Sequence, residues 1–491
     1  MMLWLLVLLP TCCGLAAYLI RSDRLRRGIW AATAILHAGF TAWLVVLHPE
    51  AVETGVWIGL DALSRLFLMV TSLLFLAATF YGIGSLRRDA LQPHPEMEQD
   101  NPLFRNRPEA VFTGCMLLFL ASMTLVVLSR NFGLQWVAVE ATTLASAPLI
   151  YFHRNRRSLE AAWKYLLICS VGIALALVGV FCIALAGTDV AHHLTVDVFT
   201  ANAGALNPRW LKLAFLFLLV GYGAKMGLAP LHNWLPDAHS EAPSPVSALL
   251  SGALLNCAFM GILRLQQVCV AAGIADFGRE LLMVFGLISM GLAGVFILRQ
   301  ADYKRMLAYS SVEHMGILAL GVGLAGTGVF GAFLHAVNHA LVKATLFMAA
   351  GNILWAYRTK RVGEVKGVAR RMPASGILWM GGFLAIVGTP PFGTFISEFT
   401  ILKTALDQGQ WMVAGMYLAF LALVFVGMAG IMIRMSLGEP DPHEPPVHTD
   451  AWCVVPPMVC GSLALVLGFY IPEGMQRLLQ HAAALIGGGG I

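Results

Sequence analysis

The chain has 491 residues, of which 58% are hydrophobic and only 12% are charged, and its formal net charge is +5 at pH 7. This composition is typical of a helical membrane protein that crosses the bilayer many times, and it argues against a soluble globular enzyme. The excess of basic residues is spread over short loops, where it fixes membrane orientation, so it gives no basis for nucleic-acid binding. The predicted class is an all-α polytopic membrane protein.

Apolar segments follow one another along almost the whole chain. Cutting the sequence at glycine, proline and charged clusters predicts about fourteen membrane spans. The first segment lacks a basic n-region and a small-residue cleavage site, so we expect a retained helix. The segments are 1–20, 29–47, 63–83, 110–129, 132–151, 163–186, 210–231, 242–265, 280–298, 304–325, 328–355, 375–404, 411–433 and 452–471.

Lysine and arginine alternate strongly between successive loops. The basic loops hold about 21 of the 32 Lys and Arg residues, against about seven in the alternate loops, and such a bias marks the cytoplasmic side. With fourteen spans in the cell (cytoplasmic) membrane, both termini are then predicted outside. The basic loops are 21–27, 84–109, 152–162, 299–305, 356–373 and 434–450.

The sequence gives no sign of a redox centre. Nine cysteines are scattered, without a CxxC pair or ligand-like spacing, so we expect neither iron–sulfur clusters nor structural disulfides. Asp237, His239 and Glu241 are expected to set the structure of a cytoplasmic loop rather than to bind metal. We therefore expect no cofactor and no metal on this chain.

Ionisable residues near the middle of apolar segments carry the functional signal. A charge at the bilayer centre costs roughly 2.5–3.5 kcal/mol on insertion scales. Several such charges in one chain therefore indicate a function, and proton or cation movement is the first candidate. The residues are Glu140, Lys225, His335, His339 and Lys343, with Glu398 near the end of another segment.

Three of these residues recur at i, i+4 and i+8. His335, His339 and Lys343 are therefore expected on one helix face, over a rise of about 12 Å. Ordered waters between such groups would form a proton wire, for which histidine is well suited. The structural alternative is a set of interhelical hydrogen bonds.

Glu140 must find a cationic partner or bind a proton, because an unpaired carboxylate in the membrane is costly. Lys225 is the expected partner, and making and breaking this pair would load and release one proton. A permanent ion pair that only holds two helices together is the alternative.

Two segments are interrupted in a related way, at 227–230 (Gly-Leu-Ala-Pro) and at 388–393 (Gly-Thr-Pro-Pro-Phe-Gly). Proline frees backbone carbonyls, which must face protein or water rather than lipid. Broken helices 7 and 12, five spans apart, indicate an inverted repeat. The predicted division is 1–109 (helices 1–3), 110–265 (first repeat, helices 4–8), 266–433 (second repeat, helices 9–13) and 434–491 (helix 14 and tail).

Several stretches match one family in order and spacing. The long motif at 223–248 resembles the signature of Mrp-type and complex I antiporter-like membrane subunits, and 302–311, 335–343 and 390–398 agree with it. The resemblance covers roughly residues 60 to 430. The motif at 310–316 and the lack of a long lateral C-terminal helix look most like the F component of hydrogenase-4 and formate hydrogenlyase-type complexes, with complex I as the alternative.

The resemblance implies fourteen helices with two inverted five-helix repeats, in a subunit that moves protons or sodium ions while other membrane subunits and peripheral redox subunits carry the electrons. It makes Glu140 and Lys225 the input pair, the residues His335, His339 and Lys343 the connecting relay, and Glu398 the terminal acid.

One departure from the family matters. The eighth helix of many relatives carries a central Lys or His, whereas here only Ser251 and Asn256 stand at the corresponding positions. These side chains orient water but hold no titrating proton. A structural subunit that docks partners without conducting is therefore the second hypothesis, and a self-sufficient cation/proton antiporter is a disfavoured third. Glu313 and His314 are expected to reflect only surface solvation and local hydrogen bonding.

Overall fold

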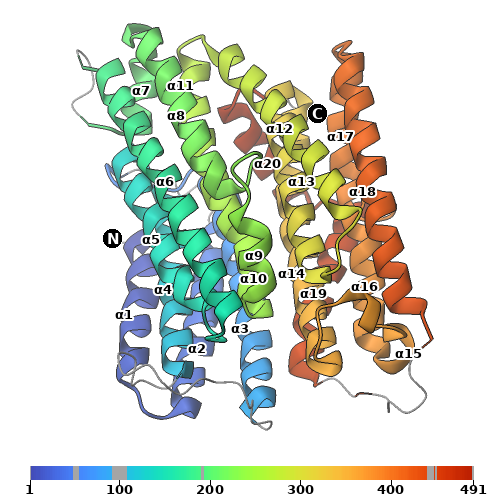
Figure 1. The fold of residues 1–491 in the computed structure, drawn as a ribbon. Helices are drawn as coiled ribbons and strands as arrows, with labels where there is room; N and C mark the ends of the chain where they lie inside the picture. The colour runs from blue at the N-terminus through green and yellow to red at the C-terminus, as the bar shows by residue number, and fades with distance from the viewer. Residues whose placement is uncertain are drawn as a thin grey trace.

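The computed structural model describes residues 2–47, 55–90, 108–188, 193–439, 447 and 450–488. Within these residues the fold is helical, with isolated β-bridges and no strand, and the long helices stand side by side in one bundle (Figure 1). Parts of the basic loops predicted at 84–109 and 434–450 lie outside the described residues. The predicted all-α fold is confirmed.

Each predicted apolar segment coincides with a helix or with a pair of helices. Eleven helices in the described part of the chain are long and apolar enough to cross a membrane, so fourteen spans stay a prediction. The N-terminal half contains α1 (Met2–Leu19), α2 (Asp23–Ala42), α3 (Ala62–Ala90), α4 (Pro108–Leu128), α5 (Phe132–Ile150), α6 (Arg156–Ala186), α7 (Val196–Ala201), α8 (Pro208–Met226) and α9 (Trp234–Glu241).

The C-terminal half continues the bundle and ends in an amphipathic helix, α20, that the sequence pattern did not predict. Its helices are α10 (Ser244–Leu249), α11 (Leu255–Ala271), α12 (Ala275–Ile297), α13 (Tyr303–Leu324), α14 (Thr327–Tyr357), α15 (Val368–Arg371), α16 (Pro373–Ile386), α17 (Gly393–Asp407), α18 (Trp411–Leu437), α19 (Ala451–Phe469) and α20 (Glu473–Leu485).

Both predicted helix breaks are present. Gly227 ends α8 and Gly388 follows α16, with positive φ angles of 86° and 65° that favour glycine. Each glycine stands three residues before a proline with a cis peptide bond, Pro230 or Pro391. A Cβ atom at Gly388 would collide with the carboxylate of Glu398, so this glycine also makes room for that side chain. The repeat boundaries themselves stay a prediction.

A single π-helical turn, Leu250–Leu254, joins α10 to α11 and gives one long helix at the centre of the bundle. Every residue of its apolar window is buried, so it contacts protein on all sides. Ser251 lies within the π turn. Such turns are frequent at functional sites, because they rotate the side chains that follow.

A buried ion cluster lies at the end of the bundle opposite the basic loops. The Asp61 carboxylate, just before α3, is bound by the guanidinium groups of Arg130 and Arg264, and Arg130 also binds Asp197. Burial alone would raise the pKa of Asp61, but Arg264 and Arg130 hold it well below its usual range. This cluster ties α3, the α4–α5 turn, α7 and α11 together.

A candidate proton relay

Lys225 lies in the last turn of α8, directly before the helix break, and its side chain is fully buried. Its Nζ atom donates hydrogen bonds to the hydroxyls of Thr143, at 2.7 Å, and Tyr165, at 2.6 Å. Tyr165 is in turn 2.7 Å from the hydroxyl of Ser146. The ammonium group is therefore held by neutral oxygens from α5 and α6.

Glu140, on α5, does not pair directly with Lys225. Its carboxylate accepts hydrogen bonds from Thr143, at 3.1 Å, and from Ser170, at 3.0 Å. The structure has no ion pair within 4.0 Å between Glu140 and Lys225, so the expectation of direct contact was wrong. The physical reason is the Thr143 hydroxyl, which both side chains use and which keeps them apart.

Lys343, on α14, has a comparable setting in the second half of the chain. Its Nζ atom donates to the backbone carbonyl of Leu307, at 2.6 Å, and to the hydroxyl of Ser310. Glu313 follows one turn further along α13, and only 3% of its side chain is exposed. The same face of α13 thus offers Lys343 its acceptors and places a buried acid close to it.

A chain of side-chain contacts leads from α13 to Glu398 on α17. Nδ1 of His314 lies 2.8 Å from Nε2 of His335, and Nδ1 of His335 lies 2.9 Å from the Ser397 hydroxyl. One ligand atom each of His314, His335 and Glu398 lie within 4.8 Å of one another. His335 and Glu398, both predicted to carry protons, therefore lie close together, and His314 lies beside both of them.

His339 stands beside this chain without a hydrogen bond. Its ring centroid is 5.0 Å from that of His314 and 6.5 Å from that of His335, and neither of its ring nitrogens has a partner. One carboxylate oxygen of Glu313 and one of Glu398 are also unpartnered. Buried polar atoms are rarely left unsatisfied, so water or a transferred proton is the expected partner at these atoms.

Two side chains that the sequence analysis dismissed belong to this cluster. Glu313 and His314 were expected to be solvated, but both are buried inside the bundle. A helix-by-helix comparison of the predicted repeats would have found Glu313, because Glu140 has the same mid-helix place in the second helix of the first repeat. His239 was expected in a loop but lies in the short helix α9, which packs against α6 and α13 and buries the ring completely.

The two candidate positions on the central helix behave differently. The Ser251 hydroxyl is 2.7 Å from that of Ser311, which neighbours the Ser310 hydroxyl that holds Lys343. Asn256 instead donates to the carbonyl of Gly252 in its own helix, at 2.8 Å. Ser251 is therefore linked to Ser311, the neighbour of the serine that holds Lys343. The Asn256 side chain has no hydrogen bond to either of these two serines.

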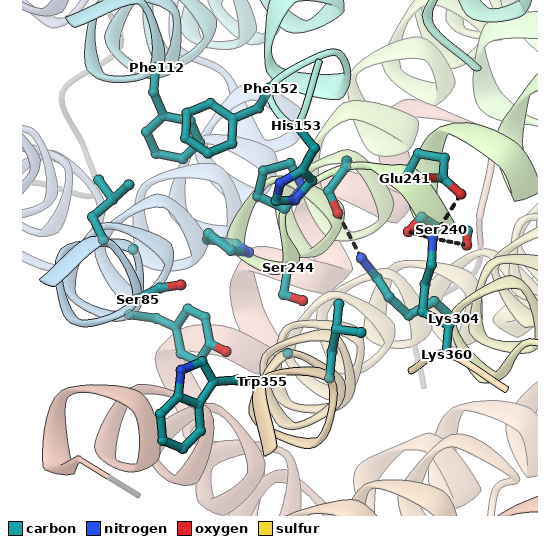
Figure 2. A pocket seen from close by; sticks show the side chains of 18 of the residues that line it. Ser85, Phe112, Phe152, His153, Ser240, Glu241, Ser244, Lys304, Trp355 and Lys360 are labelled. Carbon is teal, nitrogen blue, oxygen red and sulfur yellow. Dashed lines mark hydrogen bonds and ion pairs between the residues drawn. The ribbon is translucent and has the colours of Figure 1, made fainter. Parts of the chain in front are cut away.

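A polar cavity of about 450 Å³ opens at the end of the bundle that carries the basic loops. Figure 2 shows Lys304 at this cavity, with Lys360 bound to Glu241 and Ser240 beside it. Lys304 donates to the carbonyl of Ala242 at 2.6 Å. It lies one turn before Leu307 on α13, so one helix runs from the cavity to the acceptors of Lys343.

The His314, His335 and Glu398 donors are of a type that could hold a divalent transition metal. Three of the four ring nitrogens of His314 and His335 take part in the hydrogen bonds of His314 to His335 and of His335 to Ser397, and Nε2 of His314 has no hydrogen-bond partner.

Known proteins resemble this chain over most of its length. Residues 129–425 match the family described as "NADH:quinone oxidoreductase/Mrp antiporter, TM". The chain is 33% identical over 476 residues to the "Hydrogenase-4 component F homolog" of Methylacidiphilum infernorum (isolate V4), and the match covers 93% of this chain and 94% of the relative.

Solved structures share the fold across the whole chain. A chain of the membrane-bound sulfane sulfur reductase, an archaeal respiratory membrane complex, matches with a TM-score of 0.85 and 21% identity, covering 99% of this chain and 98% of that one. A chain of the Mrp complex from Dietzia sp. DQ12-45-1b matches with a TM-score of 0.83 and 21% identity, covering 99% and 96%. The match over residues 129–425 and the 33% identical relative show that the chain belongs to the NADH:quinone oxidoreductase/Mrp antiporter family of multi-pass membrane proteins.

Proposed function

We propose that this chain is a proton-translocating, antiporter-like membrane subunit of a membrane-bound hydrogenase or a related redox complex. The observation that carries the proposal is a buried group of polar side chains where α13, α14 and α17 meet. In it, Lys343 bonds to Ser310 on α13, and His314 and His335 contact each other close to Glu398. Electron transfer takes place in partner subunits. The basic loops face the cytoplasm, and with fourteen spans both termini then lie on the outer side of the cell membrane. The similarity to a hydrogenase-4 component F homolog supports the choice of complex.

The input element consists of Glu140, Thr143 and Lys225. Thr143 accepts a hydrogen bond from the lysine and donates one to the carboxylate. A change in charge at Glu140 therefore alters the electrostatic environment of Lys225 through this one hydroxyl. Burial disfavours a charged lysine, whereas a nearby carboxylate favours it. A change of charge at Glu140 would therefore load or release a proton at Lys225.

The output element runs from Lys343 to Glu398. Glu313 and the imidazoles of His314 and His335 supply groups that accept and return protons, and His339 offers two free ring nitrogens beside them. The cavity lined by Lys304 would let water approach this element from the cytoplasmic side, because Lys304 lies one turn before Leu307 on α13. A proton fits this line better than sodium, because much of the line consists of imidazole nitrogens and a cation cage needs oxygen ligands.

Glu140 also supports assembly with another membrane subunit. It is partly exposed on α5, and its neighbours on the same face, Val137 and Leu144, are 51% and 64% exposed. A carboxylate that faces hydrocarbon is costly, so a polar partner is expected to cover this face. The input element would then lie next to the neighbouring subunit, from which the signal for each cycle comes.

A non-conducting structural subunit is the second candidate. It is favoured by the central helix, where residues 244–261 contain no Asp, Glu, His, Lys or Arg between the two elements. A proton would have to cross this stretch through Ser251, Ser311 and water. Transport measurements decide between the two candidates.

The test is redox-driven proton uptake or release in vesicles that contain the whole complex. Wild type and Lys225→Ala are compared at matched assembly and matched electron-transfer activity. Lys212→Ala is the control, because Lys212 is an exposed lysine on the same helix α8. Loss of most of the proton signal in Lys225→Ala alone supports the pump, whereas an unchanged signal makes the chain a scaffold. A signal that disappears when sodium is replaced by choline would identify a sodium subunit.

A further inference from the structure

Two cavities adjoin at the basic-loop end of the bundle, away from the relay. One is an apolar groove of about 460 Å³ between α3 and α19. The other has a volume of about 490 Å³ and is lined by Arg24, Arg27 and Arg87. Trp452 belongs to both, so an apolar channel and a cationic pocket meet at one side chain.

The groove has the character of a site for a hydrocarbon chain. Its lining consists only of apolar side chains, from Leu73 to Phe80 on α3 and from Ala451 to Cys460 on α19. The stretch on α19 rises by about 13 Å, the length of a large part of an acyl chain. Val455 and Val459 are 47% and 46% exposed, so the groove opens to the surroundings of the bundle.

The arginines differ in how far their charge is already satisfied. Arg27 binds both carboxylate oxygens of Glu109, at 2.6 and 2.8 Å, and is thereby neutralised. Arg24 and Arg87 are exposed and have no carboxylate within ion-pair distance among the described residues. The Arg87 guanidinium lies 5.0 Å from the centre of the Trp452 ring, so it stands where the groove ends.

These positions are at the level where a membrane helix meets water. Arg24 is at the start of α2, Arg87 near the end of α3 and Trp452 at the start of α19. Arginine and tryptophan are the usual anchors at this interface, and unpaired arginines there attract anionic headgroups. A free anion would bind the arginines but would not account for the adjoining apolar groove.

We propose that this compound site binds one anionic phospholipid, with its phosphate between Arg24 and Arg87 and an acyl chain in the groove between α3 and α19. The two unpaired charges select the headgroup, and the apolar groove selects the chain. The lipid would join α2 and α3, from the beginning of the sequence, to α19 near its end. This site is independent of the proposed proton relay.

The experiment measures lipid binding to the purified full chain by native mass spectrometry after exchange into nanodiscs. Dioleoyl phosphatidylglycerol is compared with dioleoyl phosphatidylcholine on wild type, on the Arg24→Gln/Arg87→Gln double variant and on Arg370→Gln, whose arginine is exposed on α15 at the same end. One tightly retained phosphatidylglycerol is expected on wild type and on Arg370→Gln. The double variant should bind it about 25-fold more weakly, from about fivefold for each arginine.

Three results would overturn the proposal. Equal retention of phosphatidylglycerol and phosphatidylcholine, or unchanged binding in the double variant, would show that the arginines select nothing. Competition by millimolar inorganic phosphate, with no effect of Val459→Phe in the groove, would identify a free-anion site instead. Wild-type-like thermal unfolding of each variant in phosphatidylcholine shows that it is folded.

Discussion

Lys225 and Glu140 lie on opposite sides of one hydroxyl, that of Thr143. The lysine donates to this oxygen at 2.7 Å, and the hydroxyl proton points to the carboxylate at 3.1 Å. A hydroxyl has one proton to give, so its orientation depends on which neighbour carries charge. The coupling between the two ionisable groups therefore depends on a side chain that is itself never charged.

Replacing Thr143 by valine keeps the shape of the side chain and removes this link. Hydrogen bonds to charged groups contribute about 1.5–3 kcal/mol, so the rate of proton translocation is expected to fall by about tenfold or more. The measurement is redox-driven proton movement in vesicles. Thr142→Val is the matched control, because the Thr142 hydroxyl bonds only to the carbonyl of Val139 in its own helix. Equal losses in both variants would contradict the prediction.

Glu313→Gln tests the acid that stands beside Lys343. A glutamine has nearly the same size but cannot take up a proton, so translocation is expected to fall to the level of Lys343→Ala while the complex assembles. Glu280→Gln, an exposed acid on α12, should leave the signal unchanged. A fully active Glu313→Gln protein would remove this acid from the relay.

We expect bound water next to His339. Both of its ring nitrogens lie in the buried cluster without a protein partner, and buried nitrogens of this kind are almost always satisfied by water. A cryo-electron microscopy map that resolves ordered water should show at least one molecule about 2.6–3.2 Å from a His339 nitrogen. A dry, well-resolved site would speak against a water-assisted path here.

The central helix allows a direct comparison of two polar side chains. Ser251→Ala removes the contact with Ser311 and is expected to slow translocation, because no other hydroxyl of that helix contacts α13. Asn256→Ala should have the smaller effect, since its amide nitrogen bonds within its own helix and its amide oxygen has no protein partner. Translocation rates of the two variants at equal expression provide the test, and the opposite ranking would move the path to Asn256.

Asp61 is predicted to stabilise the fold in a pH-dependent way. Its pKa is lowered in the folded state, so the stabilisation is fully present above the ordinary value of about 3.9 and is lost as the pH falls through the folded value. Asp61→Asn leaves Arg130 and Arg264 without their shared acid, which should cost about 3–5 kcal/mol.

Thermal unfolding in nanodiscs at pH 7 measures this difference. Asp276→Asn serves as the control, because its carboxylate is 88% exposed and pairs only with Arg279 on the same helix. An unchanged unfolding temperature for Asp61→Asn would show that the cluster does not hold α3 to α11. Wild type should also lose stability in acid below about pH 4, more steeply than Asp61→Asn.

Apolar runs, helix breaks and isolated charges could be predicted because each is a local property. A run of about twenty apolar residues has only one stable form in a bilayer, and a glycine with a nearby proline interrupts it wherever it lies. A charge inside such a run is costly whatever surrounds it, so Lys225, Lys343 and Glu398 were visible without a structure.

The missed residues depend on how the helices pack. Glu313 and His314 looked like solvated residues, and only the contact of α13 with α14 and α17 buries them beside Lys343 and Glu398. Thr143 carried no signal at all, because a threonine in an apolar helix is common and usually bonds to its own backbone.

The sequence by itself therefore determined the class of protein, the positions of its long apolar helices and of the two breaks, and the charges placed inside apolar segments, since these follow from the free energy of each segment in lipid. Only the tertiary structure decided which hydroxyl separates Glu140 from Lys225, which histidine joins His335 to α13 and which side of Glu140 faces outward. Those contacts join helices far apart in the chain, and their geometry is set by how side chains from several helices fill the same space.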